Sequence, residues 1–277
     1  MATSGSVGFD PANKTVVVTG AGNGIGAGLA TALAGRGAKV VVADLDAEGV
    51  NRTVATITES GGVALAVPGD AASADGVAAV IAATRDAFGP IDAWFANAGV
   101  DRGRGLDAAA ADWELSWNVN VMAHVHAARA LVPEWLERGG GRFVVTASAA
   151  GLLTMLGAPA YSVTKHGAVA FAEWLSATYR HRGIVVQALC PQGVQTRMLS
   201  ESGPVEEILS HDVALTVETV ADEVIAALDS DSFLILPHSE VFDYYQVRAG
   251  NTDRWLGGMN KLQQRVDAKT NEIANGL

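Results

Sequence analysis

The stretch Lys14-Thr-Val-Val-Val-Thr19-Gly20-Ala21-Gly22-Asn23-Gly24-Ile25-Gly26 decides the fold of this chain. Its first half is a short β-branched run, which predicts a strand that is buried on both faces. The run stops at glycines, and a helical stretch follows from Gly24 to Gly35. A buried strand that leads through a glycine turn into a helix is the opening unit of a layered α/β fold.

The same alternation continues along the chain. Further strands are predicted at 39–44, 63–67, 91–96, 142–147, 184–189 and 233–236, and further helices at 77–88, 112–138, 160–181 and 219–228. Alternating strands and helices predict a parallel, seven-stranded sheet that is doubly wound, with helices on both faces, as in the Rossmann fold.

The chain is interpreted as one domain with an appendage. Residues 1–240 form the domain, and its segment 198–215 follows a strand end, where ligands bind in such sheets. Residues 241–277 are expected to add helices at 244–248 and 254–267, packed on the same domain or on a neighbouring subunit.

Composition excludes several classes of function. The 277 residues are 49% apolar and carry a net charge of −11, so a large core is expected and nucleic-acid binding is disfavoured. The single cysteine, Cys190, excludes an internal disulfide and suits a cytoplasmic protein. Neither a signal peptide nor a membrane span is indicated, and no metal is expected.

The glycine turn has the pattern Thr-Gly-x-x-x-Gly-x-Gly, formed by Thr19, Gly20, Gly24 and Gly26. Glycines let the backbone approach a pyrophosphate closely, and the helix that follows offers free N–H groups at its positive end. By itself such a turn is also compatible with an ordinary tight loop. The turn residues expected to bind a dinucleotide are Gly20, Asn23, Gly24, Ile25 and Gly26.

Asp44 ends the second predicted strand, eighteen residues after Gly26. A carboxylate there can accept both ribose hydroxyls of adenosine and would repel a 2′-phosphate. Leu45 follows it and Asn23 lies in the turn, so no cation stands at either place to bind that phosphate. NAD is therefore favoured over NADP, although an aspartate at a strand end is also a common turn residue.

Tyr161 and Lys165 lie four residues apart near the start of a predicted helix, so they share one face. A free phenol has a pKa near 10 and is a poor base at neutral pH. We expect the ammonium of Lys165 to lower the pKa of the phenol, so that Tyr161 exchanges a proton with an alcohol or a carbonyl. Ser148 follows a predicted strand thirteen residues upstream and can hold the substrate oxygen against the phenol.

Together these motifs resemble those of the short-chain dehydrogenases/reductases, and the resemblance covers about residues 12–240. It implies that Lys165 also binds the ribose and that Asn120 holds a water in the proton relay, where a structural asparagine bonded to backbone is the alternative. It implies further cofactor contacts from Asp70, Ala71, Asn97, Ala98, Gly99, Pro191, Gly193, Val194 and Thr196.

Two positions depart from the family pattern. Ala96 stands where the family has the first asparagine of Asn-Asn-Ala-Gly, and Gln192 replaces a glycine beside the expected nicotinamide. The Gln192 amide either reaches the substrate or faces solvent.

The expected substrate is an uncharged, fairly hydrophobic secondary alcohol or ketone, because the segment between Ser148 and Tyr161 is largely apolar. These side chains could equally pack the loop. The candidate pocket residues are Ala150, Leu152, Leu156 and Gln192, joined by Val100, Leu153 and Met155.

The resemblance also implies a homo-oligomer, a homotetramer or else a dimer, and an apolar stripe in the C-terminal extension has to be covered. Two other functions stay open. The chain could be a non-catalytic NAD-binding sensor or assembly protein, which need not keep a proton relay. It could also be a methyltransferase, which does not need Tyr161 and Lys165.

Overall fold

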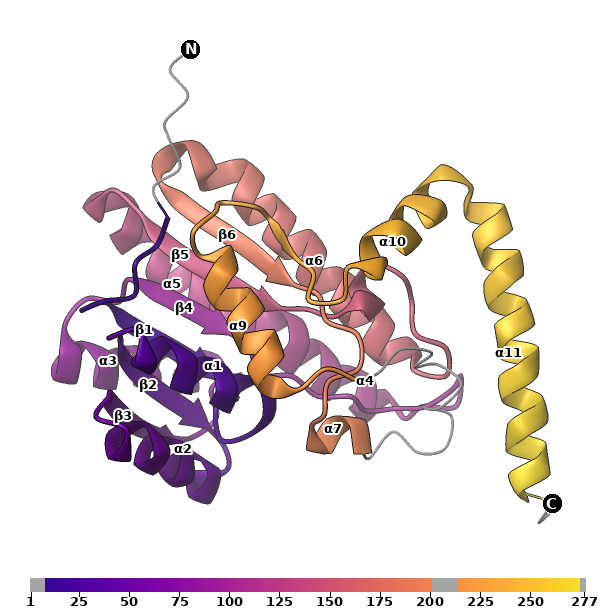
Figure 1. Cartoon of the computed structure of the whole chain (residues 1–277), viewed down its shortest axis with the longest axis horizontal. Coiled ribbons are helices and arrows are strands. Elements are labelled where there is room, and N and C mark those ends of the chain that lie inside the picture. Colours follow the sequence, from indigo (N-terminus) through magenta and orange to yellow (C-terminus); the bar gives the residue numbers. More distant parts are fainter. Residues whose placement is uncertain (1–7, 201–213, 275–277) are drawn as a thin grey trace.

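The computed structural model describes residues 8–200 and 214–274. Seven parallel strands form one sheet in the order β3-β2-β1-β4-β5-β6-β7, with helices on both faces (Figure 1). The strands are β1 (Thr15–Thr19), β2 (Lys39–Asp44), β3 (Val63–Pro68), β4 (Ala93–Ala96), β5 (Gly141–Thr146), β6 (Ile184–Leu189) and β7 (Leu234–Ile235). The predicted doubly wound fold is confirmed.

The helices follow the strands in the expected alternation. They are α1 (Gly24–Gly35), α2 (Ala47–Glu59), α3 (Ala74–Phe88), α4 (Ala110–Trp117), α5 (Ala123–Arg138), α6 (Pro159–Tyr179), α7 (Arg197–Ser200), α9 (Val217–Ala227), α10 (Glu240–Gly250) and α11 (Thr252–Ala274). Short 3₁₀ turns, η2 (Ala149–Gly151) and η3 (Arg180–Arg182), follow β5 and α6.

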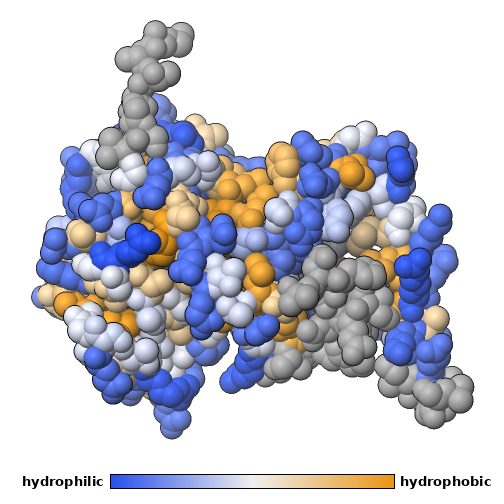
Figure 2. Space-filling model, in the orientation of Figure 1, coloured by the Kyte–Doolittle hydropathy of each residue, from blue (hydrophilic) through white to orange (hydrophobic). Residues whose placement is uncertain are grey.

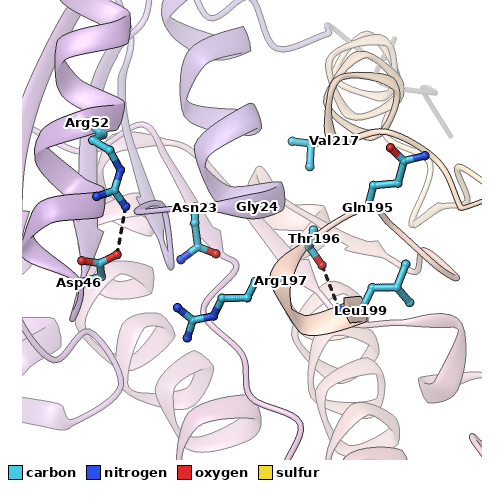
Figure 3. A pocket seen from close by; sticks show the side chains of 9 residues that line it. All are labelled: Asn23, Gly24, Asp46, Arg52, Gln195, Thr196, Arg197, Leu199 and Val217. Atoms are coloured by element: carbon cyan, nitrogen blue, oxygen red, sulfur yellow. Dashed lines mark hydrogen bonds and ion pairs between the residues drawn. The ribbon is translucent and has the colours of Figure 1, made fainter. Parts of the chain in front are cut away.

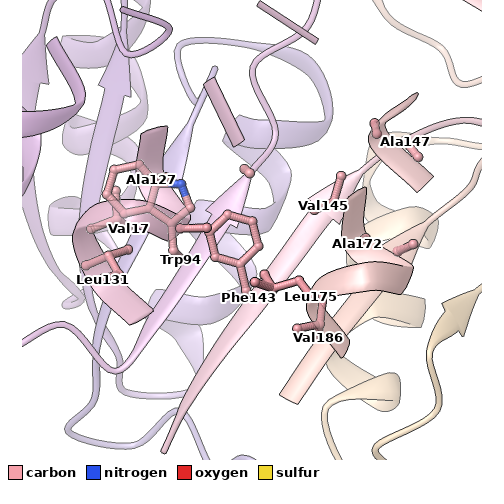
Figure 4. Packing of buried hydrophobic residues seen from close by; sticks show 14 of the residues in the cluster. Val17, Trp94, Ala127, Leu131, Phe143, Val145, Ala147, Ala172, Leu175 and Val186 are labelled. Carbon is pink, nitrogen blue, oxygen red and sulfur yellow. The ribbon is translucent and has the colours of Figure 1, made fainter. Parts of the chain in front are cut away.

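The pattern along the strands divides the core into two layers. In β1, Val16 and Val18 pack with α1, α2 and α9, whereas Val17 packs with α3, α5 and α6 on the opposite face. Figure 4 shows the second layer, where Trp94 and Phe143 meet Leu131 of α5. Because both faces are covered, the central parts of β1, β2 and β4 are apolar and buried, as the β-branched runs predict.

Helix α2 was not predicted, although its sequence carries helical signals. Val50, Thr53 and Ile57 are buried at helical spacing, and the residues between them are mostly exposed. The Asp46 side chain accepts a hydrogen bond from the amide of Gly49 and caps the helix start. The segment is therefore an amphipathic helix that packs one face on the sheet.

The helix predicted at 112–138 is one helical run with a change of pitch inside it. A π-helical turn, η1 (Asn118–Met122), lies between α4 and α5 and contains the buried Asn120. Such turns insert an extra residue and often lie at functional sites. Here the turn directs Asn120 toward the loop that follows β4.

The C-terminal helices are longer than the pattern indicates. Helix α10 lies beside α6, and α11 stands at the edge of the molecule (Figure 1). Figure 2 shows α11 to be mostly polar on the visible face. Its side chains Trp255, Met259 and Leu262 are half-buried and Val266 is buried. Among the described residues, no helix is both long enough and apolar enough to cross a membrane.

Candidate active site and cofactor cleft

The glycine turn after β1 is as tight as the sequence predicts. Gly20 has φ +64°, and a Cβ atom there would lie 2.7 Å from the Ala98 Cα atom. At Gly26 a Cβ atom would lie 2.1 Å from the Gly20 carbonyl oxygen. Only glycine fits at these two positions, so the turn can pack directly against the segment after β4 and against the start of α1.

The segment after β4 supports this turn. The Thr19 hydroxyl accepts hydrogen bonds from the amides of Asn97 (3.0 Å) and Ala98 (3.1 Å). The Asn97 side chain donates to the carbonyl oxygens of Thr19 (3.0 Å) and Gly20 (3.2 Å). Asn97 and Ala98 therefore hold the glycine turn in place, and Ala96 in β4 leaves this arrangement intact.

Asp44 lies at the edge of the same turn. Its carboxylate accepts hydrogen bonds from the amides of Gly22 and Asp46, each at 2.9 Å. Leu45 beside it is exposed. Asp70 is exposed and accepts a hydrogen bond from the amide of Ala72 (2.9 Å), while Ala71 is buried. The carboxylate of Asp44 is thus held next to the glycine turn, where an adenosine ribose was expected.

A cavity of about 700 Å³ opens between the first turn of α1 and helix α7 (Figure 3). Residues from both sides line it: Asn23, Gly24, Asp46, Arg52, Gln195, Thr196, Arg197, Leu199 and Val217. Three of these residues were not predicted, Asp46, Arg52 and Arg197, because nothing in their spacing relates them to the glycine turn. Within the described residues, Ile25 does not line this cavity, although it is half-buried beside it.

The charges in this cavity are paired. Arg52 lies 3.4 Å from a carboxylate oxygen of Asp46 and 3.9 Å from one of Glu48. Hydrogen bonding from the amide of Gly49 lowers the pKa of Asp46. Asp46 is therefore ionised at neutral pH and pairs with Arg52, while Arg197 lines the opposite side of the cavity.

The chain fits a dinucleotide on structural grounds. The glycines let the turn pack closely at the start of α1, and the first turn of α1 contains no acidic residue that would repel a phosphate. Within the described residues, the Asn23 side chain makes no capping hydrogen bond, so it does not occupy the helix start. Backbone N–H groups at such a helix start are suited to a pyrophosphate.

Ser148, Tyr161 and Lys165 come together at the carboxyl ends of β5 and β6. Ser148 follows β5 and is buried, and its hydroxyl accepts a hydrogen bond from the amide of Ala150 (3.1 Å). Tyr161 is half-buried in the first turn of α6, and Ser148 interacts with its phenol. The Lys165 Nζ atom lies 5.6 Å from the centre of the Tyr161 ring.

The expected lowering of the Tyr161 pKa is wrong for the chain by itself. Burial raises the pKa of Tyr161 to about 12, and the interaction with Ser148 only partly opposes this. Burial also lowers the pKa of Lys165 to about 8. The ammonium donates a hydrogen bond to the carbonyl oxygen of Thr146 (2.8 Å), so it is directed to the backbone of β5 and leaves the phenol dominated by desolvation.

Asn120 connects the helical run to the loop after β4. Its side-chain oxygen accepts from the amide of Val100, and its amide nitrogen donates to the carbonyl oxygen of Val100, both at 2.9 Å. The same nitrogen donates to the Thr164 hydroxyl (3.0 Å). A Cβ atom at Gly99 would lie 3.2 Å from Lys165 Nζ and 3.3 Å from the Asn120 side-chain oxygen, so both groups border this glycine. These contacts match the structural alternative for the Asn120 side chain.

The candidate pocket residues divide into two groups. Leu152 and Leu153 are buried in the core layer, and Ala150 is also buried, so packing accounts for these side chains. Met155, Leu156 and Val100 are half-buried. Of the loop expected at 198–215, residues 201–213 lie outside the described residues.

The Pro191–Thr196 segment runs from the site to the cavity. The carbonyl oxygen of Pro191 accepts a hydrogen bond from the amide of Ala149 (2.8 Å), and Val194 pairs with Leu215 in an isolated bridge. The backbone N–H of Gln192 donates a hydrogen bond to His238 Nδ1 (3.2 Å). Within the described part of the chain, the buried side-chain oxygen of Gln192 has no hydrogen-bond partner. Gly193 lies in the same segment. Thr196 borders the first turn of α1, because a Cβ atom at Gly24 would lie 3.2 Å from the Thr196 methyl carbon.

Comparison with known proteins agrees with this architecture. A family model described as short chain dehydrogenase matches residues 14–207. A 1-deoxy-11-beta-hydroxypentalenate dehydrogenase from Streptomyces exfoliatus is 35% identical over 235 residues, which cover 82% of this chain and 84% of that protein. A cyclohexanol dehydrogenase from Acinetobacter sp. (strain SE19) is 29% identical, with 83% and 94% covered.

A solved structure is also similar. It is a short chain dehydrogenase/reductase from Burkholderia phymatum in complex with NAD, with a TM-score of 0.82, 29% identity, and coverage of 88% of this chain and 96% of that one. A doubly wound sheet with a glycine turn and a Ser–Tyr–Lys group defines a nicotinamide-dependent oxidoreductase. The chain belongs to the short-chain dehydrogenase family, whose members act on CH–OH groups.

Proposed function

We propose that this protein is an NAD-dependent dehydrogenase that interconverts a secondary alcohol and a ketone. The observation that carries the proposal is the meeting of Ser148, Tyr161 and Lys165 at the carboxyl ends of β5 and β6. The carboxyl edge of a parallel sheet is where ligands bind in doubly wound folds.

In this proposal each of the three side chains has its own role in catalysis. The Ser148 hydroxyl holds the substrate oxygen, and Tyr161 takes the alcohol proton in oxidation or returns it in reduction. When bound, the cofactor supplies the hydride acceptor or donor, and its oxidised ring is a cation. We expect the phenol of Tyr161 to ionise more readily beside a positive charge, which offsets part of the effect of its burial. Lys165 binds the ribose, and Asn120 supports the proton relay by holding the Val100 segment next to Lys165.

The preference for NAD rests on the charges near the ribose position. Asp44 and Asp46 are both acidic, and Arg52 is already paired with Asp46. A 2′-phosphate placed beside Asp44 would be repelled by that carboxylate. The NAD in the similar Burkholderia structure is consistent with this preference.

We infer an uncharged, hydrophobic and cyclic substrate. The half-buried Met155, Leu156 and Val100 are apolar, and the buried side-chain oxygen of Gln192 has no hydrogen-bond partner among the residues that the structure describes. A relative with similar length is named for cyclohexanol, a cyclic secondary alcohol.

An initial-rate assay with cyclic and open-chain secondary alcohols tests the proposal, with NAD and NADP as separate arms. We expect Tyr161→Phe to abolish turnover while NAD binding persists, and Tyr179→Phe at the end of the same helix to retain activity. Wild-type rates in Tyr161→Phe would refute the assignment. Turnover of no alcohol, with NAD still bound, would favour the non-catalytic sensor.

Asp44→Ala tests the cofactor preference. Loss of the carboxylate should lower the affinity for NAD and reduce the discrimination against NADP. Asp75→Ala, at an exposed position of α3, should change neither affinity. An unchanged ratio of the two cofactor affinities would contradict the role of Asp44.

We also propose a homo-oligomer, most simply a tetramer, in the cytoplasm. Leu115, Trp117, Val163 and Trp174 expose large apolar surfaces on α4 and α6, and such residues commonly mark subunit contacts. The buried, unpaired thiol of Cys190 agrees with a reducing compartment. Sedimentation as a monomer at micromolar concentration would refute the assembly.

A further inference from the structure

The loop between η2 and α6 contains a strained residue. Thr154 has φ +82°, in the left-handed region that β-branched residues rarely adopt. Its side chain is exposed, so no burial of the threonine compensates for this conformation. Such a backbone persists only where the surrounding structure holds it in place. The contacts on either side of Thr154 therefore decide how the loop is held.

Helix α6 holds the loop after Thr154. The amide of Met155 donates to the Ser162 hydroxyl (2.9 Å), and that hydroxyl donates to the carbonyl oxygen of Met155 (3.1 Å). Ser162 is buried, and it lies next to Tyr161 in the sequence. This contact fixes the loop to the helix that carries the proposed acid/base residue.

Helix α10 holds the loop before Thr154. The Arg248 guanidinium donates a hydrogen bond to the carbonyl oxygen of Leu152, and the same nitrogen lies 3.0 Å from His166 Nε2. The other ring nitrogen of His166 lies 2.9 Å from the carbonyl oxygen of Ser162. One arginine thus reaches both the loop and the helix that follows it.

The chemistry of these groups assigns the direction of each bond. An arginine can only donate, so His166 Nε2 accepts and the neutral ring carries its proton on Nδ1. That N–H then donates to the Ser162 carbonyl oxygen. Arg248, His166 and Ser162 thus form one continuous chain of hydrogen bonds.

Arg248 comes from a helix that is itself fixed. Val241 of α10 is fully buried, and Tyr245 packs against the same core layer as Leu152. Figure 1 shows α10 beside α6. The family model ends at residue 207, so this anchor comes from a part of the chain that the family pattern does not cover.

We propose that Arg248 is a positioning residue that fixes the loop between Ser148 and Tyr161 through the Leu152 carbonyl, so that helix α10 helps decide which substrates fit. The half-buried Met155 and Leu156, which follow the strained Thr154, are the side chains that this anchor places. The role in substrate choice rests on the proposed function, whereas the anchoring of the loop does not.

Hydrogen exchange tests the anchoring in the whole protein. In the wild type the amides of Leu153 and Thr154 donate to the carbonyl oxygens of Ala149 (2.8 Å) and Ala150 (3.3 Å). Arg248→Met should speed exchange at these amides and at Met155 by about tenfold, because a charge-assisted bond that holds the loop closed is lost. Arg254→Met, at an exposed position of α11, is the control and should leave exchange unchanged. Equal exchange in the wild type and Arg248→Met would overturn the proposal.

Kinetics test the effect on substrates. For the alcohols that the wild type oxidises, Arg248→Met should raise KM by about tenfold and change kcat less, with NAD affinity unaltered, because only loop placement is lost. A KM for every alcohol within error of the wild type would refute the role in substrate choice. If the wild type oxidises no alcohol, the proposed function fails, and the exchange comparison still decides the anchoring.

Two further variants, Arg248→Lys and Thr154→Gly, test the same proposal independently. Arg248→Lys keeps a donor and should restore part of the exchange protection, which covers the case in which Arg248→Met fails to fold. Thr154→Gly removes the conformational strain, so the loop should then depend less on the anchor. Arg248→Met should accelerate loop exchange less in the Thr154→Gly background, and an undiminished effect there would contradict the link to strain.

Discussion

Replacing Lys165 with methionine should change how the stability of the protein depends on pH. Lys165 is 3% exposed, and its ammonium donates a hydrogen bond to the Thr146 carbonyl oxygen. Methionine has a similar length and no charge, so it fills the same space without the cost of burying an ammonium.

The magnitude follows from the pKa of Lys165, which burial lowers from 10.5 to about 8. Between these two values the unfolded chain binds the proton and the folded protein does not, so the free energy of unfolding rises with pH across this window. The full shift corresponds to about 3 kcal/mol. Below pH 8 the wild type carries the whole penalty. The variant loses a hydrogen bond of about 1–2 kcal/mol, so it should be more stable by on the order of 1 kcal/mol at neutral pH.

Urea unfolding, followed by tryptophan fluorescence from neutral pH to pH 10.5, measures this effect. The difference in unfolding free energy between the wild type and Lys165→Met should change by about 3 kcal/mol in favour of the wild type as pH rises. Lys261→Met, at an exposed position of α11, should show no such change. A difference that stays constant over the whole range would show that Lys165 is not desolvated, and the reasoning would fail.

Three other outcomes are expected. Gly26→Ala should abolish NAD binding in calorimetry, because the added Cβ would lie 2.1 Å from the Gly20 carbonyl oxygen and distort the glycine turn. Normal affinity for NAD would contradict the role of this turn in binding the cofactor. In the protein without cofactor, Tyr161 should ionise only near pH 12, seen as the ultraviolet absorbance change that Tyr161→Phe lacks. Burial lowers the pKa of His124 from 6.5 to about 3, so stability should fall as pH drops below 6.5. His124→Leu should remove most of this acid sensitivity and His126→Leu should not; equal acid profiles in denaturant unfolding would refute it.

The fold was largely predictable because its signals are local. The β-branched runs stop at glycines or acidic residues, and an unbroken apolar run indicates a strand that is buried on both faces. The turn from Gly20 to Gly26 is equally local, since its glycines are required by backbone conformation and close approach. Helix α2 was missed although its amphipathic repeat and its Asp46 cap are local signals, whereas the π-helical turn at Asn120 was not predictable, because tertiary contacts decide it.

Parts of the site could be located from spacing alone. Tyr161 and Lys165 share a helix face because four residues make about one turn, and Ser148 follows a strand that ends at the same edge of the sheet. Asp44 lies beside the glycine turn because β1 and β2 are parallel neighbours. In each case the sequence position implies a place in the fold, since strand ends and helix faces are regular.

The environment of these residues was decided only by the tertiary structure. Spacing suggested that Lys165 lowers the pKa of Tyr161, but the ammonium is directed to the Thr146 carbonyl oxygen and burial raises that pKa instead. Arg248 reaches the Leu152 carbonyl across 96 positions of sequence. The sequence by itself therefore determined which groups gather at the sheet edge, because strands and helices repeat regularly. Packing of distant segments determined how strongly these groups are desolvated and what holds them, because burial is a property of the whole folded chain.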